Sequence, residues 1–211
     1  MGEIKNYFTN IIAGAILSGI SISIGCTIYL SIGGVEGAIL FAFGLLTVIH
    51  YGWALYTGQA GFIQTKSDIK KLILILLFNI AGCIITAWLI KYAKPEIIDN
   101  AVKIISLRCN NNLLQNLILS VGCGFIMTIA VKFARQKQYL PLLFGIPVFI
   151  LCGFIHSIAD AFYISLTPIT FVKQNFINVV TYYTIIVLGN FVGCNLIRLI
   201  NLDLNYDNRH S

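Results

Sequence analysis

The chain has 211 residues, of which 58% are apolar and only 10% are charged, and its net charge is +6. About a quarter of the residues of a soluble globular domain are charged, so this composition excludes a water-soluble protein. Six helical membrane spans of about 20 residues each would use about 120 residues. They would take up nearly all of the apolar sequence, and no polar stretch remains that is long enough to fold as a separate soluble domain.

Charged residues divide the sequence into six windows of spanning length. We expect membrane helices at residues 11–33, 37–64, 72–90, 112–132, 140–165 and 177–198. Helices are expected rather than a β-barrel because backbone groups in hydrocarbon must be hydrogen-bonded internally, and because no ten-residue alternating segments occur. The second and fifth windows exceed the length of a straight span, which leaves room for a break in each.

The predicted topology is a single six-helix domain over residues 11–200. The first apolar run is too long for a signal peptide, so the first helix is expected to be retained. An even number of spans puts both termini on one side, and the positive-inside rule puts residues 1–10 and 201–211 in the cytoplasm. The inner segments would then carry most of the cations, namely Lys5, Lys66, Lys70, Lys71, Lys132, Arg135, Lys137, Arg198 and Arg209. This bias explains the positive net charge without a nucleic-acid partner.

Short matches between the two halves of the chain indicate an internal repeat. The pattern Asn-x-x-Gly-Cys begins at Asn79 in the third window and again at Asn190 in the sixth. A hydroxyl residue also precedes a helix breaker at Thr57 in the second window and at Thr167 in the fifth. Two alternatives stay open. Such matches arise by chance in apolar sequence, and the asparagines would also serve as interhelical hydrogen-bonding residues beside glycines that permit close helix contact.

The predicted repeat has halves at about residues 11–92 and 112–200. Three helices in each half place the two halves in opposite orientations across the membrane. This is the inverted-repeat plan of many transporters and channels, in which broken helices meet near the midplane and their ends line the pathway.

Two ionisable residues fall inside the fifth window, where Asp160 follows His156 by one helical turn. Ionisable side chains within a membrane face an interior cavity or a pathway by default. This favours His156 as a pathway residue over a buried structural histidine. Three roles are open for Asp160: it bonds to His156, caps a broken helix, or lies protonated against a neighbouring span. Arg108, after the polar external loop, either concentrates anions at a pore mouth or anchors its helix at the lipid headgroups.

The pair of His156 and Asp160 would also suit an intramembrane enzyme, as a base and its orienting partner, or a non-conducting sensor. No serine or cysteine nucleophile motif accompanies the pair. The six cysteines form no CxxC pair and lie mostly within predicted spans, where they are typical of small packing residues. We therefore expect no catalytic residue, no metal site and no cofactor.

Three segments, in the right order and in matching windows, resemble signature motifs of the formate/nitrite transporter family. Residues 153–160, GFIHSIAD, resemble the G-F-E-H-S-[IV]-A-N of the family's fifth span. Residues 52–58, GWALYTG, are similar to the G-[AC]-[ED]-L-[FY]-T-[GS] of its broken second helix. Residues 189–193, GNFVG, are similar to the G-N-[IL]-[IV]-G of its sixth span. The resemblance covers nearly the whole chain.

The resemblance implies an all-α, aquaporin-like bundle of six membrane helices, with helices 2 and 5 interrupted, assembled as a homo-pentamer with one pore per protomer. On the matching positions, His156 would be the central pore histidine, Thr57 the threonine of the interrupted second helix, and Asn190 an asparagine bonded to that histidine. Arg108 would replace the lysine of the external vestibule. The apolar constrictions would be formed by Phe41, Leu45, Leu55, Tyr56 and Phe149.

The chain departs from the family pattern at three positions. Ile155 and Ala54 stand where the family has acidic residues, and Asp160 stands where it has an asparagine. Asp160 would then modulate the histidine, by holding the second nitrogen of His156 and favouring the imidazolium.

The function implied is the passage of a small monovalent weak-acid anion across a bacterial inner membrane. An anion meets a large desolvation penalty at an apolar constriction, and its neutral acid does not. Because burial also raises the anion's proton affinity, we expect protonation in transit. Formate, nitrite, hydrosulfide, acetate and lactate all suit such a pore. Abundant Ile, Asn and Lys beside few Ala are typical of an AT-rich genome, as in some anaerobic bacteria, which favours formate first and hydrosulfide or nitrite next.

Overall fold

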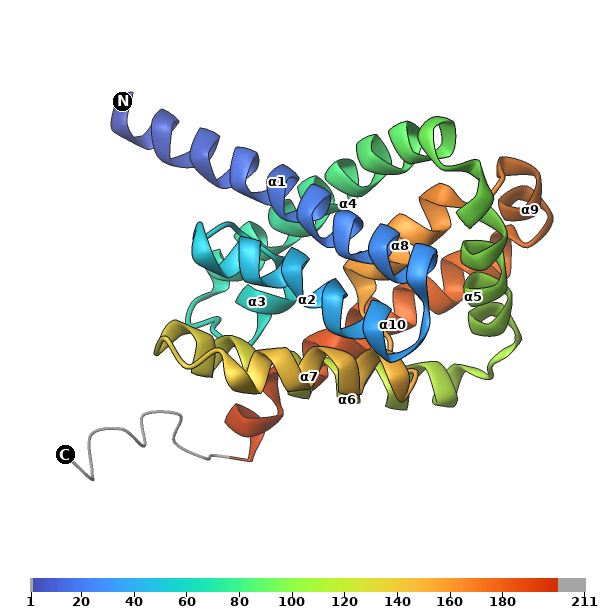
Figure 1. Ribbon diagram of the computed structural model, residues 1–211. Helices are drawn as coiled ribbons and strands as arrows, with labels where there is room; N and C mark the ends of the chain where they lie inside the picture. Colours follow the sequence, from blue (N-terminus) through green and yellow to red (C-terminus); the bar gives the residue numbers. More distant parts are fainter. Residues whose placement is uncertain (1, 201–211) are drawn as a thin grey trace.

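The structure is a computed structural model that describes residues 2–200, and all regular structure in that range is helical (Figure 1). In chain order the helices are α1 (Gly2–Ile32), α2 (Gly34–His50), α3 (Tyr56–Ala60), α4 (Lys66–Ala93), the short 3-10 helix η1 (Pro95–Ile97), α5 (Ile98–Asn110), α6 (Leu113–Arg135), α7 (Leu140–Leu151), α8 (Ser157–Leu166), α9 (Ile169–Gln174) and α10 (Phe176–Leu199).

Among the described residues, four helices are long and apolar enough to cross a membrane, namely Thr9–Ile32 within α1, and α4, α6 and α10. Three shorter apolar helices, α2, α7 and α8, complete the apolar part of the bundle. The second predicted window contains α2 and α3, with a non-helical segment at residues 51–55 between them. The fifth window contains α7 and α8, separated by residues 152–156. Both breaks fall inside the two windows that were too long for straight spans.

The helices differ from the predicted ones in three regions. α1 already begins at Gly2, so the predicted N-terminal segment is helical from that residue onward. The polar stretch before the fourth window contains η1 and α5, and α9 follows the fifth window. Sequence reasoning missed these helices because they are too short or too polar to form a span. The predicted C-terminal segment, 201–211, lies outside the described residues.

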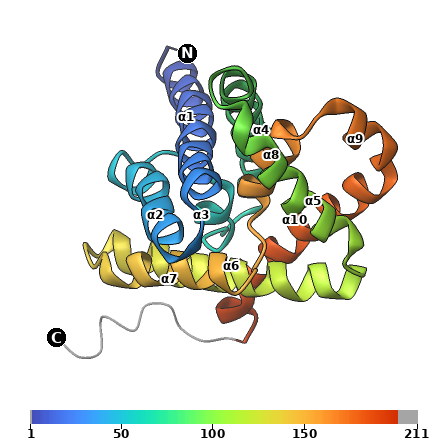
Figure 2. The same ribbon diagram turned by 45° about the vertical axis from the view of Figure 1, so that its right-hand side comes forward.

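The bundle has two distinct ends (Figures 1 and 2). Both ends of the described chain lie on one side of the molecule, and α5 and α9 lie on the other. We call these sides the terminal end and the α5 end. α6 and α10 run parallel, since Gly189 lies against Ser120 and Gly193 lies against Val121. α6 therefore begins at the α5 end and finishes at the terminal end, beside the last turn of α10.

Each break in a helix begins with a glycine in the left-handed region. The φ angle is +65° at Gly52 and +75° at Gly153, a conformation that residues with a Cβ atom rarely adopt. No atom lies within 4 Å of where a Cβ would stand on either glycine, so it is the backbone conformation that requires glycine there. The chain then continues in an extended conformation to Leu55 and His156, the N-cap residues of α3 and α8.

The two halves of the chain share one packing arrangement. α1 crosses α4 where Gly19 meets Gly82, and a Cβ on Gly82 would lie 3.1 Å from the Cα of Gly19. α6 crosses α10 where Gly124 meets Gly193, and the equivalent distance is 3.0 Å. Such close approach of membrane helices requires small residues at the crossing. Gly82 and Gly193 are the glycines of the repeated Asn-x-x-Gly-Cys pattern, so the sequence repeat corresponds to equivalent helix crossings.

We predict that Gly193→Ala lowers the free energy of unfolding by about 1–3 kcal/mol, because the added methyl group overpacks a contact between two backbones. Thermal unfolding of the protein in detergent measures this. Gly14→Ala on α1 is the matched control, since its Cβ would lie at an ordinary 3.5 Å from its nearest neighbour, the backbone N of Ala54. Equal melting temperatures for the two variants would contradict the tight crossing.

Apolar side chains fill the inside of the bundle and also cover its outside. The buried cluster between the halves includes Leu45, Ile146 and Phe162. Trp88 and Ile177 are among the many large apolar residues that point outward and are exposed. An apolar outer surface is expected where the surrounding medium is lipid, because lipid tails are as apolar as these side chains.

Candidate functional site

The two breaks meet through a hydrogen bond between Thr57 and His156. Thr57 lies in the first turn of α3, and His156 is the N-cap residue of α8. The Oγ1 atom of Thr57 and the Nε2 atom of His156 are 2.9 Å apart, and both side chains are buried. The two residues that sequence analysis placed at the pore centre are thus in direct contact.

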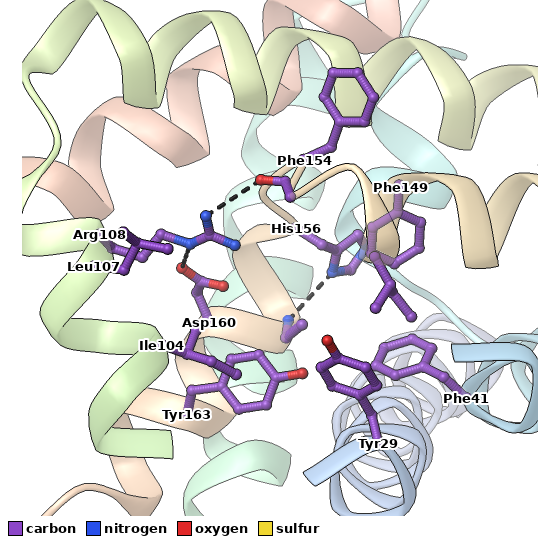
Figure 3. A pocket seen from close by; sticks show the side chains of 13 residues that line it. Tyr29, Phe41, Ile104, Leu107, Arg108, Phe149, Phe154, His156, Asp160 and Tyr163 are labelled. Carbon is purple, nitrogen blue, oxygen red and sulfur yellow. Dashed lines mark hydrogen bonds and ion pairs between the residues drawn. The ribbon is translucent and has the colours of Figure 1, made fainter. Parts of the chain in front are cut away.

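The hydrogen bond made by Nδ1, the second ring nitrogen of His156, determines which tautomer the neutral ring adopts. The backbone N–H of Ala159 donates to Nδ1 of His156 at 3.2 Å (Figure 3). Because Nδ1 accepts a hydrogen bond, a neutral His156 carries its proton on Nε2. Nε2–H then donates to the hydroxyl oxygen of Thr57. The hydroxyl hydrogen of Thr57 is left available for a third group.

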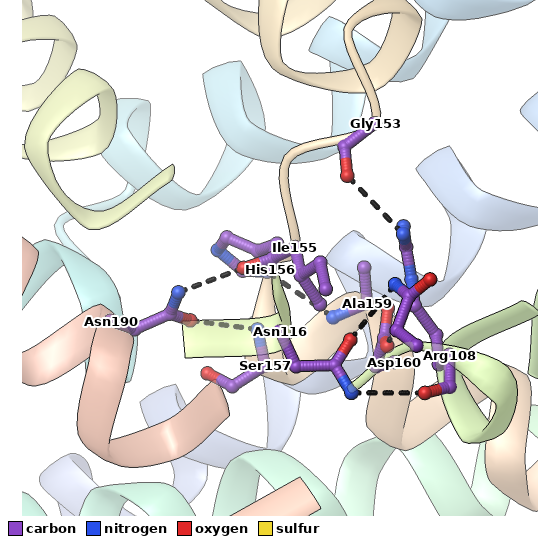
Figure 4. A network of polar contacts seen from close by, with 10 residues as sticks. Arg108, Asn116, Gly153, Ile155, His156, Ser157, Ala159, Asp160 and Asn190 are labelled. Carbon is purple, nitrogen blue, oxygen red and sulfur yellow. Dashed lines mark hydrogen bonds and ion pairs between the residues drawn. The ribbon is translucent and has the colours of Figure 1, made fainter. Parts of the chain in front are cut away.

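Two asparagines hold the two breaks in the same way. The Oδ1 atom of Asn190 accepts from the backbone N–H of Ser157 at 2.8 Å, and its Nδ2 donates to the carbonyl oxygens of Ile155 and Ser120, each at 2.8 Å (Figure 4). Asn190 thereby holds the backbone on both sides of His156. Asn190 was predicted to bond to the histidine side chain, but it bonds to the neighbouring backbone instead. The N–H and C=O groups freed by the break need these partners because the membrane interior offers no water.

Asn79 does the same for the first break. Its Oδ1 accepts from the backbone N–H of Tyr56 at 2.9 Å. Its Nδ2 donates to the carbonyl oxygens of Ala15 at 2.7 Å and Ala54 at 2.9 Å. Tyr56 in the first half therefore corresponds to Ser157 in the second. Sequence reasoning identified the asparagine pair, and only the structure shows that each asparagine binds its own half's break.

The cysteines of the repeated pattern connect the halves to each other. The Sγ atom of Cys83 donates to the carbonyl oxygen of Ile158 at 3.4 Å, and that of Cys194 donates to the carbonyl oxygen of Thr57 at 3.5 Å. Each thiol thus contacts the half helix of the opposite half. All six cysteines are free, and these two are weak donors as well as packing residues.

The pairing of Thr57 with Thr167 across the repeat was wrong. Tyr56 corresponds to Ser157, so the position equivalent to Thr57 is Ile158. Thr167 instead lies at the C-terminus of α8, where its hydroxyl donates to the carbonyl oxygen of Tyr163 at 2.9 Å and its own carbonyl accepts from Lys91 at 3.1 Å. The mismatch arises because α8 is longer than α3, so the two halves do not keep a constant spacing.

A cavity of about 170 Å³ opens at the α5 end and reaches the histidine (Figure 3). Phe41 and Phe149 lie at its inner boundary, with ring centroids 5.9 Å apart, and the ring of Phe149 stacks on that of His156 at 5.9 Å. Arg108 and Asp160 supply its charges. The cavity therefore has a charged side wall and an apolar inner boundary beside His156.

A second cavity, of about 140 Å³, opens at the terminal end. Leu45 and Leu55 line it, and Arg135 is its charged residue. Phe41 and Leu45 lie one turn apart on α2, a rise of about 5.4 Å. The two cavities are therefore separated by about one helical turn. We call the region between the two cavities the separation. Four of the five predicted constriction residues border it, namely Phe41, Leu45, Leu55 and Phe149. Tyr56 lines neither cavity, and its hydroxyl donates to the carbonyl oxygen of Val187 at 3.1 Å.

Arg108 is held in the wall of the α5-end cavity by two contacts. Its Nη1 donates to the carbonyl oxygen of Gly153 at 3.2 Å, and its Nε lies 3.7 Å from Oδ2 of Asp160 (Figure 4). The Arg108 side chain is 11% exposed and that of Asp160 is 2% exposed. The interpretation of Arg108 as a headgroup anchor is therefore wrong for this side chain, which points inward.

Asp160 contacts the arginine and not the histidine. Its partner is Arg108, and the nitrogen of His156 that Asp160 was expected to hold is occupied by the N–H of Ala159. The suggested stabilisation of an imidazolium by Asp160 therefore has no support in the geometry. One turn of separation in sequence was misleading because His156 is the N-cap residue of α8, where its side chain folds back onto the helix end instead of projecting from its face.

The arrangement as a whole is typical of a membrane transporter or channel, in which two interrupted helices meet between cavities that open toward opposite ends. The model of the formate/nitrite transporter family matches residues 1–201, and the chain belongs to this family. It is a multi-pass membrane protein of a family of transporters, which decides against the enzyme interpretation. Within residues 9–200 there is no cluster of three or more His, Cys, Asp or Glu residues that would hold a metal ion.

Solved structures share the fold. A pentameric formate channel with formate bound is similar with a TM-score of 0.80, at 20% identity over 96% of this chain and 100% of that chain. A formate/nitrite transporter family ion channel is similar with a TM-score of 0.72, at 16% identity over 98% of this chain and 92% of that one. No curated protein sequence matches significantly.

Proposed function

We propose that each protomer forms a pore for small monovalent weak-acid anions, formate first and hydrosulfide or nitrite next. The observation that carries this proposal is the pair of arginine-containing cavities, one at each end, separated by about one turn of helix at the contact between Thr57 and His156. A cationic cavity concentrates anions. An apolar separation excludes them unless their charge is neutralised.

The geometry supports a specific order of events. An anion enters the α5-end cavity near Arg108 and advances between Phe41 and Phe149. As its surroundings become less polar, its proton affinity rises because burial disfavours the charged form. It takes up a proton from a hydronium ion supplied by the bulk water, crosses as the neutral acid, and releases the proton to water in the terminal-end cavity.

Thr57 and His156 would receive the anion at the separation. The free hydroxyl hydrogen of Thr57 donates a hydrogen bond to the arriving anion. Nε2–H of His156 polarises that hydroxyl, since a chain of hydrogen bonds strengthens each member. The neutral histidine acts here as a donor in a hydrogen-bond chain, and the proton on the permeant does not have to come from its ring.

The assembly proposed is a homo-pentamer in a bacterial inner membrane, with both termini in the cytoplasm. Support for the pentamer and for formate comes from the similar structure described as a pentameric formate channel with formate bound. The cations at the terminal end, among them Lys66, Lys71, Lys132 and Arg198, support the cytoplasmic placement of that end. The single six-helix domain remains our proposal for residues 11–200.

Flux into liposomes that contain the purified protein tests the proposal. We expect formate and nitrite to enter faster than into protein-free liposomes, and faster as the pH falls, because a larger fraction of the anion is then protonated. Chloride should not enter, since it is not protonated at these pH values. Thr57→Val should lower formate flux about tenfold or more, because a hydrogen bond to a charged group contributes about 1.5–3 kcal/mol.

The matched control is Thr128→Val, which removes a buried hydroxyl that donates to the carbonyl oxygen of Cys194 and lines neither cavity. This variant should keep wild-type flux. Equal flux for both threonine variants would contradict the role of Thr57. Absence of formate and nitrite flux from a folded oligomer would overturn the proposed function.

A further inference from the structure

The terminal-end cavity contains a cation that sequence analysis treated only as part of an inner loop. Arg135 lies in the last turn of α6 and lines this cavity together with Leu45 and Leu55. Apart from Arg135, the polar side chains that line the cavity are Gln59 and the indole of Trp53. The cavity is therefore an apolar recess with one positive charge.

Arg135 is positioned by two contacts. Its Nη2 donates to the carbonyl oxygen of Gly58 at 3.1 Å, and its guanidinium carbon lies 3.9 Å from the centroid of the Phe62 ring. Gly58 directly follows Thr57, so the guanidinium is attached to the same turn of α3 that holds the threonine. A guanidinium has five N–H donors, and the contact with Gly58 uses one nitrogen. The planar group is thus fixed in place with further N–H donors to offer.

No carboxylate of the part of the chain whose side chains are described pairs with Arg135. No acidic side chain lines the terminal-end cavity. Asp68 lies in the first turn of α4, and its carboxylate accepts from the backbone N–H groups of Gln64 at 3.0 Å and Thr65 at 2.8 Å. Within residues 9–200, Arg135 forms no ion pair, whereas Arg108 lies 3.7 Å from Asp160.

We propose that Arg135 forms a second anion-binding site, in the terminal-end cavity, which receives the permeant anion on the side of the separation opposite to Arg108. The site takes a small monovalent anion through the guanidinium N–H groups that do not contact Gly58. Because Asp160 offsets part of the charge of Arg108, whereas no carboxylate within residues 9–200 forms an ion pair with Arg135, the terminal-end site binds the anion more tightly. This inference rests on the proposed pore function for its role in transport, but the binding itself is measurable without transport.

Fluorescence of Trp53 measures the binding directly, since this residue lines the same cavity. The chain has two tryptophans, so the test uses the full chain with Trp88→Phe, which changes an exposed outward-facing residue. The probes are iodide, an anionic quencher, and acrylamide, a neutral one. Arg135→Gln should lower the iodide quenching constant of Trp53 at least twofold and leave the acrylamide constant unchanged. Formate should protect Trp53 from iodide in the parent protein and not in Arg135→Gln.

Arg198→Gln is the matched control. Arg198 lies at the same end, in the last turn of α10, and also donates to a backbone carbonyl, that of Ile63, but it does not line the cavity. Arg198→Gln should quench like the parent, and Arg135→Lys should recover most of the iodide quenching. Equal iodide constants for Arg135→Gln and Arg198→Gln would overturn the inference. If Arg135→Gln did not fold, absence of formate protection in the parent would overturn it equally.

Transport gives the second measurement, in liposomes sorted by the side on which the terminal end faces. Arg135→Gln should raise the half-saturating formate concentration about tenfold when formate is applied at the terminal end, and less than threefold when it is applied at the α5 end. If the wild-type protein conducts formate and Arg135→Gln has the same half-saturating concentration as the wild type at both ends, the second site is refuted and the proposed function stands. If the wild-type protein conducts no formate but the iodide quenching of Trp53 still depends on Arg135, the pore is refuted and the anion-binding site stands.

A lipid phosphate is the other anion that a guanidinium at a membrane end could bind. Both measurements are therefore made in phosphatidylcholine vesicles and in vesicles containing phosphatidylglycerol. We expect the Arg135→Gln effect in both. An effect confined to vesicles with the anionic lipid would identify a headgroup contact and overturn the proposal.

Discussion

Arg108→Leu is expected to lower the free energy of unfolding by about 3–5 kcal/mol, because it removes one member of a buried ion pair and leaves the other charge unpaired. The Asp160 side chain is 2% exposed, and it forms its ion pair with the guanidinium that the variant lacks. The variant also removes the donor to the carbonyl oxygen of Gly153, at the left-handed turn that begins the second break. Formate flux should fall at least tenfold, since the α5-end cavity loses its cation. Melting temperature in detergent and flux in liposomes measure the two effects.

The double variant Arg108→Leu with Asp160→Asn distinguishes the contribution of Arg108 to protein stability from its attraction of the anion. Removing the unpaired carboxylate should recover most of the lost melting temperature, since an amide has no charge to desolvate. Formate flux should stay low, because no cation has been restored. Asp160→Asn alone should keep the flux, and it should cost less stability than Arg108→Leu, because the Arg108 side chain is 11% exposed and lines a cavity where water can reach it. If the double variant regained wild-type flux, Arg108 would be a structural residue and not an anion attractor.

Asn190→Leu is expected to lower the free energy of unfolding by about 3 kcal/mol or more and to abolish formate flux. The substitution leaves the N–H of Ser157 and the carbonyl oxygens of Ile155 and Ser120 without their partner, and each buried unsatisfied group costs about 1–3 kcal/mol. His156 lies between Ile155 and Ser157, whose backbone groups Asn190 binds. Its ring would therefore lose its position even if the helices stayed packed.

Asn195→Leu is the matched control for this prediction. Asn195 lies further along the same helix, and its Nδ2 donates to the carbonyl oxygens of Phe191 and of Ala60, the last residue of α3, neither of which flanks His156. This variant should cost about 1 kcal/mol and retain flux. Asn79→Leu should behave like Asn190→Leu, since it removes the equivalent bonds at the first break. A stable, conducting Asn190→Leu protein would show that the break does not depend on its asparagine.

Much of the architecture was predictable because its determinants are local. Apolar window lengths and charge positions indicated the helical membrane class and the two windows that contain the breaks. His156, Thr57 and Arg108 were found because polar or charged residues are conspicuous in an apolar chain. Their partners could not be predicted, because they depend on how distant segments meet. His156 bonds to a threonine 99 residues away, and Asp160 turns toward a different helix.

Arg135 was overlooked for a different reason. A cation in the last turn of a helix at the cytoplasmic end is the ordinary signal of membrane orientation, so nothing in the sequence distinguishes it from Lys132 or Lys137. The distinction lies in the carbonyl of Gly58 and the ring of Phe62, which hold the guanidinium over a cavity.

The hydrogen bonds by which Cys83 and Cys194 each reach the half helix of the opposite half limit how the molecule can move during transport. α8 belongs to the second half but packs on α4 of the first, with Cys83 bonded to Ile158, and α3 packs on α10 with Cys194 bonded to Thr57. A rocking motion of one half against the other, as in an alternating-access carrier, would have to pull each half helix out of the opposite half. We therefore expect a stationary frame in which only side chains at the separation move. Turnover should then be limited by diffusion and protonation of the permeant rather than by a slow conformational cycle.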